Sequence, residues 1–214
     1  MTLENNTVKK LVIPDKFKPV IGASAFYLLM MAIFIFFAPN VFLNVGMFTA
    51  VFLSLPLYII MGLSLVFVTV AGEIDLSVAS IMNLTSASIG FTYFRGVPFG
   101  LSVLIGLIVG TLCGILNGIL VTKFGLQSLA VTIGTLALFR GLCYVLLGNQ
   151  PVDFLSAKIT HIGYDNIPHT FFPYTTVLIV LLGAAAWVTL HYTRIGRWTF
   201  SLGINTEAAV FSGI

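Results

Sequence analysis

Residues 68–84 read VTVAGEIDLSVASIMNL, and they place two carboxylates, Glu73 and Asp75, between two long apolar segments. The runs on either side, 47–70 and 76–94, have the length of a helix that crosses the hydrocarbon core of a bilayer. An unpaired carboxylate at the bilayer centre costs a few kcal/mol or more, so it is rarely found there without a function. The pair therefore marks either a turn at the membrane edge or a polar path through the membrane.

The composition indicates a membrane protein. The 214 residues are 58% hydrophobic and 8% charged, whereas soluble domains carry about a quarter charged residues. So few charges cannot cover a water-facing surface, which excludes an ordinary soluble domain. In this setting the net charge of +3 is no indication of nucleic-acid binding, and we expect no nucleic-acid partner.

The sequence predicts neither a metal site nor a catalytic centre. Cys113 and Cys143 lie in apolar stretches without ligand spacing, and we interpret them as small packing residues. No HExxH pattern, Walker motif or nucleophile–base set is present. We therefore expect no enzymatic activity and no cofactor in this chain.

Six apolar runs predict six membrane-spanning helices. A helix satisfies its own backbone hydrogen bonds in lipid, whereas a barrel would need alternating strands of about ten residues, and these runs do not alternate. The expected fold is an all-α polytopic transmembrane bundle of about six spans, forming one domain over residues 1–214. The runs cover residues 20–38, 47–70, 76–94, 98–122, 127–148 and 174–191.

The positions of the cations predict a cytoplasmic N-terminus. In that orientation the outer side carries only Arg95 and Lys158. Residues 1–18 then form a basic cytoplasmic segment, 149–173 a long outside loop, and 192–214 a cytoplasmic segment. The outside loop is either a docking surface for an external partner or a plain solvated loop. The inner side carries Lys9, Lys10, Lys16, Lys18, Lys123, Arg194 and Arg197.

Asp75 has two interpretations, and its spacing leaves both open. It precedes an apolar helical run, so its carboxylate can accept from the free N–H groups of the next turn, assisted by Ser77. Alternatively the stretch lines a substrate path, because Pro56 and Gly62 can bend the preceding span and many transporters build sites at broken helices.

Arg140 is a second anomaly, because it lies well inside the fifth apolar run. A guanidinium stays charged, so it either snorkels towards the outer end of the span or faces the interior of the bundle. Asn83, Asn117, Thr132 and Thr135 also lie on apolar helices. Each could bind a hydroxyl-rich solute, although bonding across a helix interface is the commoner use.

The segment TRIGRWTFSLGINTEAAVFSGI, residues 193–214, follows the sixth span. Asn205 or Thr206 can cap a short helix whose first turn contains Glu207, an acidic residue suited to a helix N-terminus. A short helix on the cytoplasmic face would be a docking ridge for a soluble partner. The spacing alone does not distinguish this ridge from a linker.

Three stretches resemble, in this order, the monosaccharide-type permease subunits of bacterial ABC importers, with ribose-type sugar permeases as the nearest relatives. They are GEIDLSVAS (72–80), NGILVTKFGLQSLAVTIGTLALFRGLCYVLLGNQPV (117–152) and the 193–214 segment quoted above. The resemblance covers most of residues 40–214. It implies a multi-pass permease of the bacterial inner membrane that translocates a small sugar by alternating access.

The resemblance also implies partners. They are cytoplasmic ATPase subunits that bind ATP and Mg, an extracytoplasmic solute-binding protein, a second permease copy or homologue, and membrane lipid. The family's members are longer and have more spans. We therefore expect this chain to be an N-terminal portion, a natural truncation or a fragment, that stops at Ile214 inside the coupling segment.

The family's motifs and the polar residues on the apolar runs together give the residues that we expect to carry function. The Gly-Gly-Ile-Asp-Leu-Ser pattern falls on residues 72–77, with Glu73 where glycine is usual, and Arg140 matches the arginine of an Arg-Gly pair. The expected substrate pathway comprises Gly72, Glu73, Asp75, Ser77, Asn83 and Arg140. The Glu-Ala-Ala-x-x-x-Gly pattern falls on Glu207, Ala208, Ala209 and Gly213. Together with the cap candidate Asn205, these are the expected ATPase-coupling residues.

Two other functions remain open from the sequence. An ion- or proton-coupled secondary transporter would use Glu73 or Asp75 as a titrating group and would need no ATPase. An ABC permease for branched-chain amino acids or a quorum-sensing signal would keep the same machinery and change only the solute.

Overall fold

The computed structural model describes residues 18–148, 163, 165–168, 170 and 172–213. Within this part of the chain the regular elements are helices and no strand occurs, which confirms the predicted all-α fold. The expected basic segment 1–18 lies almost entirely outside the described residues, as does most of the expected outside loop 149–173.

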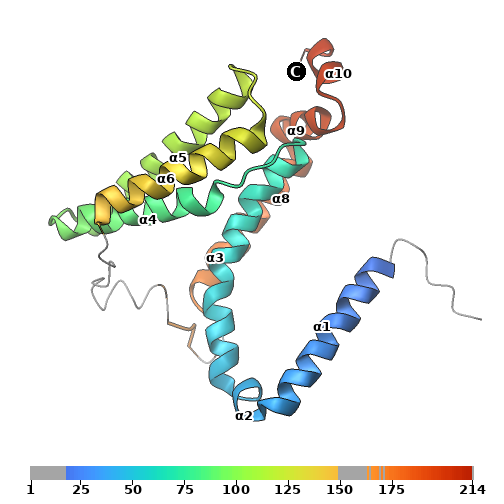
Figure 1. The fold of residues 1–214 in the computed structure, drawn as a ribbon, viewed down its shortest axis with the longest axis vertical. Helices are drawn as coiled ribbons and strands as arrows, with labels where there is room; N and C mark the ends of the chain where they lie inside the picture. Colours follow the sequence, from blue (N-terminus) through green and yellow to red (C-terminus); the bar gives the residue numbers. More distant parts are fainter. Residues whose placement is uncertain (1–17, 149–162, 164, 169, 171, 214) are drawn as a thin grey trace, which may run out of the picture. The chain divides into compact units, whose positions relative to one another are not determined.

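Six long helices correspond to the six predicted apolar runs, but α4 is shorter than the others. Five of the six are long and apolar enough to cross a membrane. α4 has 17 residues and reaches about 25 Å, which is the lower limit for a span. The long helices are α1 Lys18–Phe37, α3 Val45–Val70, α4 Val78–Phe94, α5 Phe99–Thr122, α6 Ser128–Leu147 and α8 Thr175–Tyr192; the short ones are α2 Pro39–Phe42, α9 Arg194–Ile204 and α10 Thr206–Phe211 (Figure 1).

The chain divides into two compact units, which meet within α3 between Val51 and Phe52. In the N-terminal unit, Pro39 lies in the first turn of α2, where a missing N–H leaves no hydrogen bond unmade. Phe34 of α1 stacks on Phe42 of α2, with 5.1 Å between the ring centroids. This contact joins α1 to α2 within the unit.

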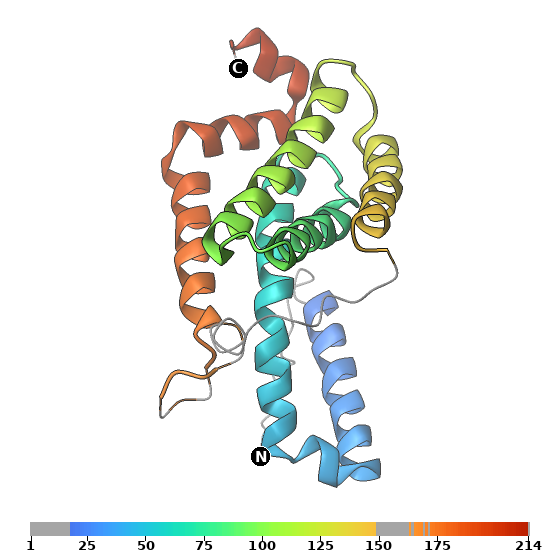
Figure 2. The same cartoon turned by 90° about the vertical axis from the view of Figure 1, so that its left-hand side faces the viewer.

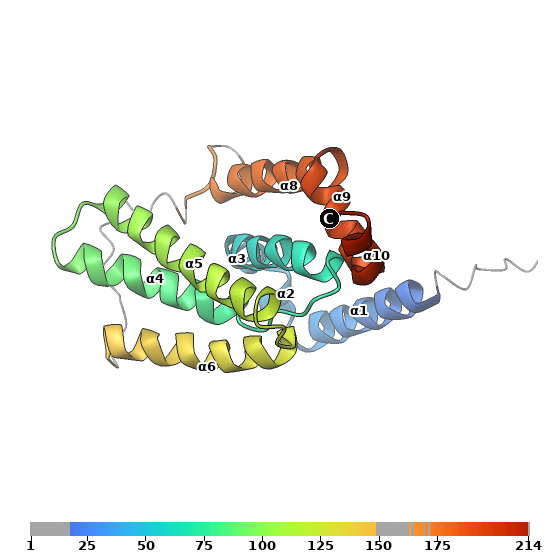
Figure 3. The same ribbon diagram turned by 90° about the horizontal axis from the view of Figure 1, so that it is seen from above.

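In the second unit α4 packs against both α5 and α6, and Figure 3 shows the three helices side by side. Leu84 of α4, Cys113 of α5 and Phe139 of α6 form a buried apolar cluster. The approach of α5 to α4 depends on small residues, since a Cβ at Gly106 would collide with the side chain of Ile89. These contacts make α4 the central helix of the unit's core.

Large apolar side chains remain exposed on the long helices. Phe36 is 80% exposed and Val145 is 81% exposed, and similar residues occur along each of the five candidate spans. Water would disfavour so much exposed apolar surface, whereas lipid accommodates it. The fold is therefore that of a multi-pass membrane protein.

A sharp elbow joins α8 to α9, and Figure 2 shows α9 lying crosswise at the end of α8. Thr193 forms the elbow: its hydroxyl donates to the carbonyl of Thr189 at 2.6 Å and accepts from the N–H of Gly196 at 3.4 Å. The same side chain thus terminates α8 and caps α9.

Two glycines let α9 lie against the ends of two long helices. A Cβ at Gly196 would collide with the carbonyl of Leu190 in the last turn of α8. A Cβ at Gly203 would collide with the carbonyl of Val70, the last residue of α3. Because the two glycines are two turns apart, both contacts lie on one face of α9.

Candidate functional site

The stretch that joins α3 to α4 contains the two carboxylates and begins with a glycine turn. Gly72 has a φ of +84°, a left-handed conformation that glycine adopts without strain. A Cβ on Gly72 would lie 3.5 Å from the Cα of Gly203 in α9. The turn that presents Glu73 therefore depends on a glycine and lies beside Gly203 of α9.

Asp75 organises the start of α4. Its Oδ1 accepts from the backbone N–H of Ser77 at 2.7 Å and from the Ser77 hydroxyl at 2.6 Å. Ser77 is fully buried and directly precedes the first residue of α4. The carboxylate thus accepts two hydrogen bonds from Ser77, the residue just before the helix. The sequence predicted that it would accept from N–H groups inside the first turn of the helix.

The hydroxyl of Ser77 also joins α4 to α5. Because its single proton is donated to Asp75, it can only accept from Asn117, whose Nδ2 donates at 2.8 Å. Because the Ser77 hydroxyl has no second proton to donate, Oδ1 of Asn117 is buried without a hydrogen-bond donor among the described residues. Asn117 therefore bonds across a helix interface, the commoner of its two expected uses.

α6 holds the backbone of Ile74, which lies between the two carboxylates. The N–H of Ile74 donates to Oγ of Ser128 at 3.3 Å. The Thr132 hydroxyl donates to the carbonyl of Ser128 at 2.8 Å and to that of Ile74 at 3.4 Å. Since Ser128 and Thr132 are one helical turn apart, both face the same stretch.

A cavity of about 350 Å³ opens beside this stretch. Glu73 and Asp75 line it, with Asn117 from α5 and Thr132 from α6. Glu73 is exposed and forms no ion pair with any residue in the described part of the chain. The polar groups around the cavity are mainly oxygen acceptors, which suit a ligand that carries hydrogen-bond donors.

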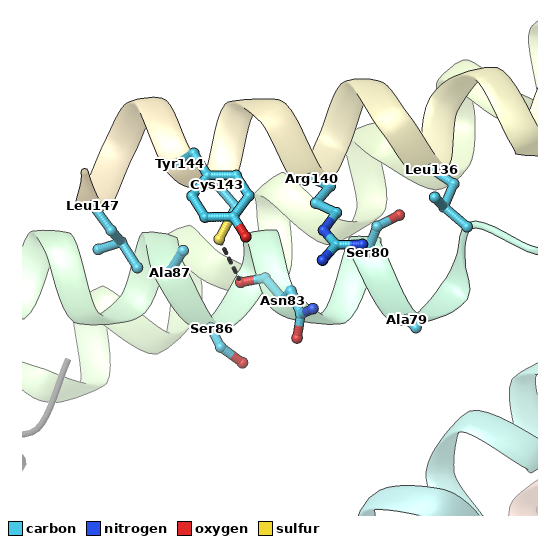
Figure 4. Close-up of a pocket in the computed structure, with 10 residues that line it drawn as sticks. All are labelled: Ala79, Ser80, Asn83, Ser86, Ala87, Leu136, Arg140, Cys143, Tyr144 and Leu147. Carbon is cyan, nitrogen blue, oxygen red and sulfur yellow. Dashed lines mark hydrogen bonds between the residues drawn. The ribbon is translucent and has the colours of Figure 1, made fainter. Parts of the chain in front are cut away.

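A larger cavity of about 570 Å³ lies between α4 and α6 (Figure 4). The side chain of Arg140 extends from α6 towards Ser80 and Asn83 on α4. Sγ of Cys143 lies 3.8 Å from the backbone carbonyl of Asn83. The other lining residues are Ala79, Ser86, Ala87, Leu136, Tyr144 and Leu147.

The guanidinium of Arg140 makes no hydrogen bond or ion pair with another residue in the described ranges, although Arg140 lines this cavity. A guanidinium within a membrane needs water or a polar partner, and the cavity has room for both. The side chain of Arg140 extends towards α4, and the residue as a whole is exposed.

Four of the six expected pathway residues line one of two cavities. Glu73 and Asp75 line the smaller cavity, and Asn83 and Arg140 line the larger one. Gly72 and Ser77 line neither cavity and instead shape the connection between α3 and α4. The structure therefore brings the expected residues together in two places.

Several residues that lie beside the expected ones were not predicted from the sequence. Ser80, Ser86 and Tyr144 line the larger cavity, and Cys143, interpreted as a packing residue, lines it too. Helical periodicity could have indicated two of them. Ser80 and Ser86 lie three residues before and after Asn83, and residues at this spacing share a helix face. Nothing in the local sequence indicated that Ser128 would hold the α3–α4 connection.

The C-terminal segment forms the expected short helix, α10. Asn205 caps it, since its Oδ1 accepts from the N–H of Ala208 at 2.9 Å, which confirms one of the two predicted caps. Glu207 lies in the first turn and is exposed, whereas Ala209 is buried. Gly213, with a φ of +81°, follows the helix.

The chain is similar in sequence to one protein family and to several import permeases. Residues 47–214 match the family described as branched-chain amino acid transport system / permease component. The chain is 32% identical over 158 residues to the ribose import permease of Bacillus subtilis, covering 72% of this chain and 48% of that protein. It is 32% identical over 167 residues to the autoinducer 2 import system permease of Yersinia pestis, covering 78% and 47%.

A third relative is the fructose import permease of Rhizobium meliloti, which is 34% identical over 162 residues, covering 72% of this chain and 45% of that protein. The chain thus spans about half the length of the curated relatives that it matches. No solved structure matches the chain.

Proposed function

Because the chain belongs to the permease-component family of branched-chain amino acid transport systems, we propose that it is the permease subunit of an ATP-driven importer and translocates a small sugar by alternating access. The observation that carries the proposal is its similarity to import permeases, two of which are named for the monosaccharides ribose and fructose. As a multi-pass protein of the inner membrane, it has the location that such a role requires.

The cavity between α4 and α6 is our candidate for part of the solute route. Arg140, Asn83 and Ser80 supply donors and acceptors there, which are the groups that bind sugar hydroxyls. A hydroxyl-rich solute can replace water around the guanidinium without leaving it unsolvated. Glu73 and Asp75, beside the smaller cavity, would contact the solute at another stage of its passage.

The α10 helix is our candidate for the contact with the ATPase. Glu207 and Ala208 are exposed there, and Phe211 is 91% exposed, so the helix offers a surface to a partner. ATP and Mg would be bound by the ATPase subunits. This arrangement requires a cytoplasmic N-terminus, as the distribution of cations predicts. A solute-binding protein would act on the other side, and a second permease copy or homologue would complete the pathway.

The test is uptake of labelled pentoses and hexoses by cells that produce the chain with its ATPase and binding protein. We expect uptake that requires the ATPase and is lost in Glu207→Arg, which reverses the charge on the exposed face of α10. Glu207→Gln, which keeps the size of the side chain, is the matched control and should retain part of the uptake. Immunodetection in membranes establishes that each variant is produced.

Three outcomes would contradict the proposal. Uptake that ignores the ATPase and collapses with the proton gradient would indicate a secondary transporter. Competition by autoinducer 2 or branched-chain amino acids, and not by sugars, would change the solute. Absence of uptake with the chain, the ATPase and the binding protein all present would show that this chain does not serve as the permease of that importer.

A further inference from the structure

The α9 helix lies at the level where two candidate membrane spans end. Those spans finish at Val70 and Tyr192. α9 begins two residues after Tyr192, and its glycine face contacts the carbonyl end of α3 at Val70 through Gly203. A helix that crosses the ends of two spans occupies the boundary between hydrocarbon and water, where phospholipid headgroups lie.

The side chains of α9 are segregated around the helix. At 100° per residue, Arg194, Arg197 and Ser201 gather on the side away from Gly196 and Gly203. Large apolar side chains flank this polar side and remain partly exposed, including Ile195 at 57% and Trp198 at 48%. A basic polar side with aromatic and aliphatic flanks is the pattern of a helix lying in a membrane interface.

The two arginines have no acidic partner in the described part of the chain. Neither guanidinium forms an ion pair or a side-chain hydrogen bond with a described residue, and both residues are exposed. Aromatic residues of the kind that anchor proteins at headgroup level occur close by, since the rings of Trp187 and Tyr192 lie 5.1 Å apart at the end of α8. The surface thus combines unpaired positive charge with interfacial anchors.

We propose that α9 is an interfacial helix whose Arg194 and Arg197 bind the phosphate groups of anionic phospholipids. Charge complementarity selects this occupant, because two unpaired guanidinium groups at headgroup depth face a surface of phosphates. The inference does not depend on the transported solute or on the ATPase contact at α10. An acidic surface of a soluble protein is the rival occupant.

The test uses the fluorescence of Trp198. The chain has two tryptophans, so Trp187→Phe leaves Trp198 as the single reporter. The purified chain is reconstituted in phosphatidylcholine vesicles that contain a minor fraction of brominated lipid, either phosphatidylglycerol or phosphatidylcholine. Brominated chains quench tryptophan on contact, so the ratio of quenching by the two lipids reports which one surrounds α9.

We expect brominated phosphatidylglycerol to quench Trp198 more than brominated phosphatidylcholine does. Arg194→Gln and Arg197→Gln should each lower this preference, by up to roughly fivefold. Arg197→Lys keeps the charge and should retain most of the preference. Arg95→Gln is the matched control: it removes one positive charge between α4 and α5, far along the chain from α9, and should leave the ratio unchanged. Circular dichroism checks that each variant is folded.

Equal quenching by the two lipids would overturn the proposal. An unchanged quenching ratio in both Arg194→Gln and Arg197→Gln would also overturn it. An equal fall of the ratio in Arg95→Gln would do the same, because the effect would then reflect net charge alone. Weak quenching by both lipids would place α9 in water and would favour a protein as the occupant of its basic side.

Discussion

The side-chain amide of Asn117 donates to the Ser77 hydroxyl at 2.8 Å, across 40 residues of sequence. The Ser77 hydroxyl in turn donates to Oδ1 of Asp75 at 2.6 Å, so α5 is connected to a carboxylate in the break between two helices. The two carboxylates of this break therefore differ in their surroundings. Both line the same cavity, but Asp75 is half-buried and hydrogen-bonded to Ser77 at the start of α4, whereas Glu73 is exposed.

Replacing Asn117 by leucine should destabilise the fold. The variant removes the donor to the buried Ser77 hydroxyl, and an unmade hydrogen bond of this kind costs about 1–3 kcal/mol. Thr111→Val on the same helix is the control, because the Thr111 hydroxyl bonds only to the carbonyl of Leu107 in its own helix. Denaturant titration in detergent micelles should show a loss of unfolding free energy in the first variant alone.

Gly203→Ala should be more disruptive than an ordinary glycine substitution in a helix. The added Cβ collides with the carbonyl of Val70, so α9 must shift, at a cost of about 1–3 kcal/mol. At Gly134 a Cβ meets nothing within 4 Å, and alanine there should be neutral or stabilising by about 0.5–1 kcal/mol. Equal melting temperatures of the two variants would contradict the close approach of α9 to α3.

Ser128→Ala should loosen the stretch that carries the carboxylates. The N–H of Ile74 loses its acceptor, so its hydrogen exchange should accelerate by up to roughly tenfold. Ser64→Ala removes a hydroxyl that bonds only to Met61 within α3 and should leave exchange at Ile74 unchanged. Mass spectrometry of peptides covering residues 72–77 provides the measurement.

The two cysteines should differ in their reaction with a water-soluble thiosulfonate. Cys143 is half-buried and lines the cavity beside Arg140, whereas Cys113 is buried in the packing of α4, α5 and α6. We expect Cys113→Ser to be labelled and Cys143→Ser to resist labelling. The opposite pattern would show that water does not enter the cavity between α4 and α6. If this cavity is part of the proposed solute route, a bound sugar should slow the labelling of Cys143.

Local patterns were sufficient for several features. The apolar runs predicted all the long helices, although α4 proved shorter than expected because Ser77 still belongs to the connection. Asn205 was predictable as a cap because a capping side chain acts on N–H groups two or three residues ahead. The same rule places Asp75 at the correct end of α4, where its carboxylate accepts from the N–H of Ser77, two residues ahead, and also from the Ser77 hydroxyl.

The sequence by itself determined an all-α membrane fold, the helical segments and the cap of α10, because hydropathy and capping act over a few neighbouring residues. Only the tertiary structure decided that Arg140 extends towards Asn83, that Asn117 reaches Ser77, and that Gly203 lies against Val70. These pairs lie on different elements. Their contacts depend on the rotation and depth at which helices pack, and those are set by the shapes of whole helix surfaces.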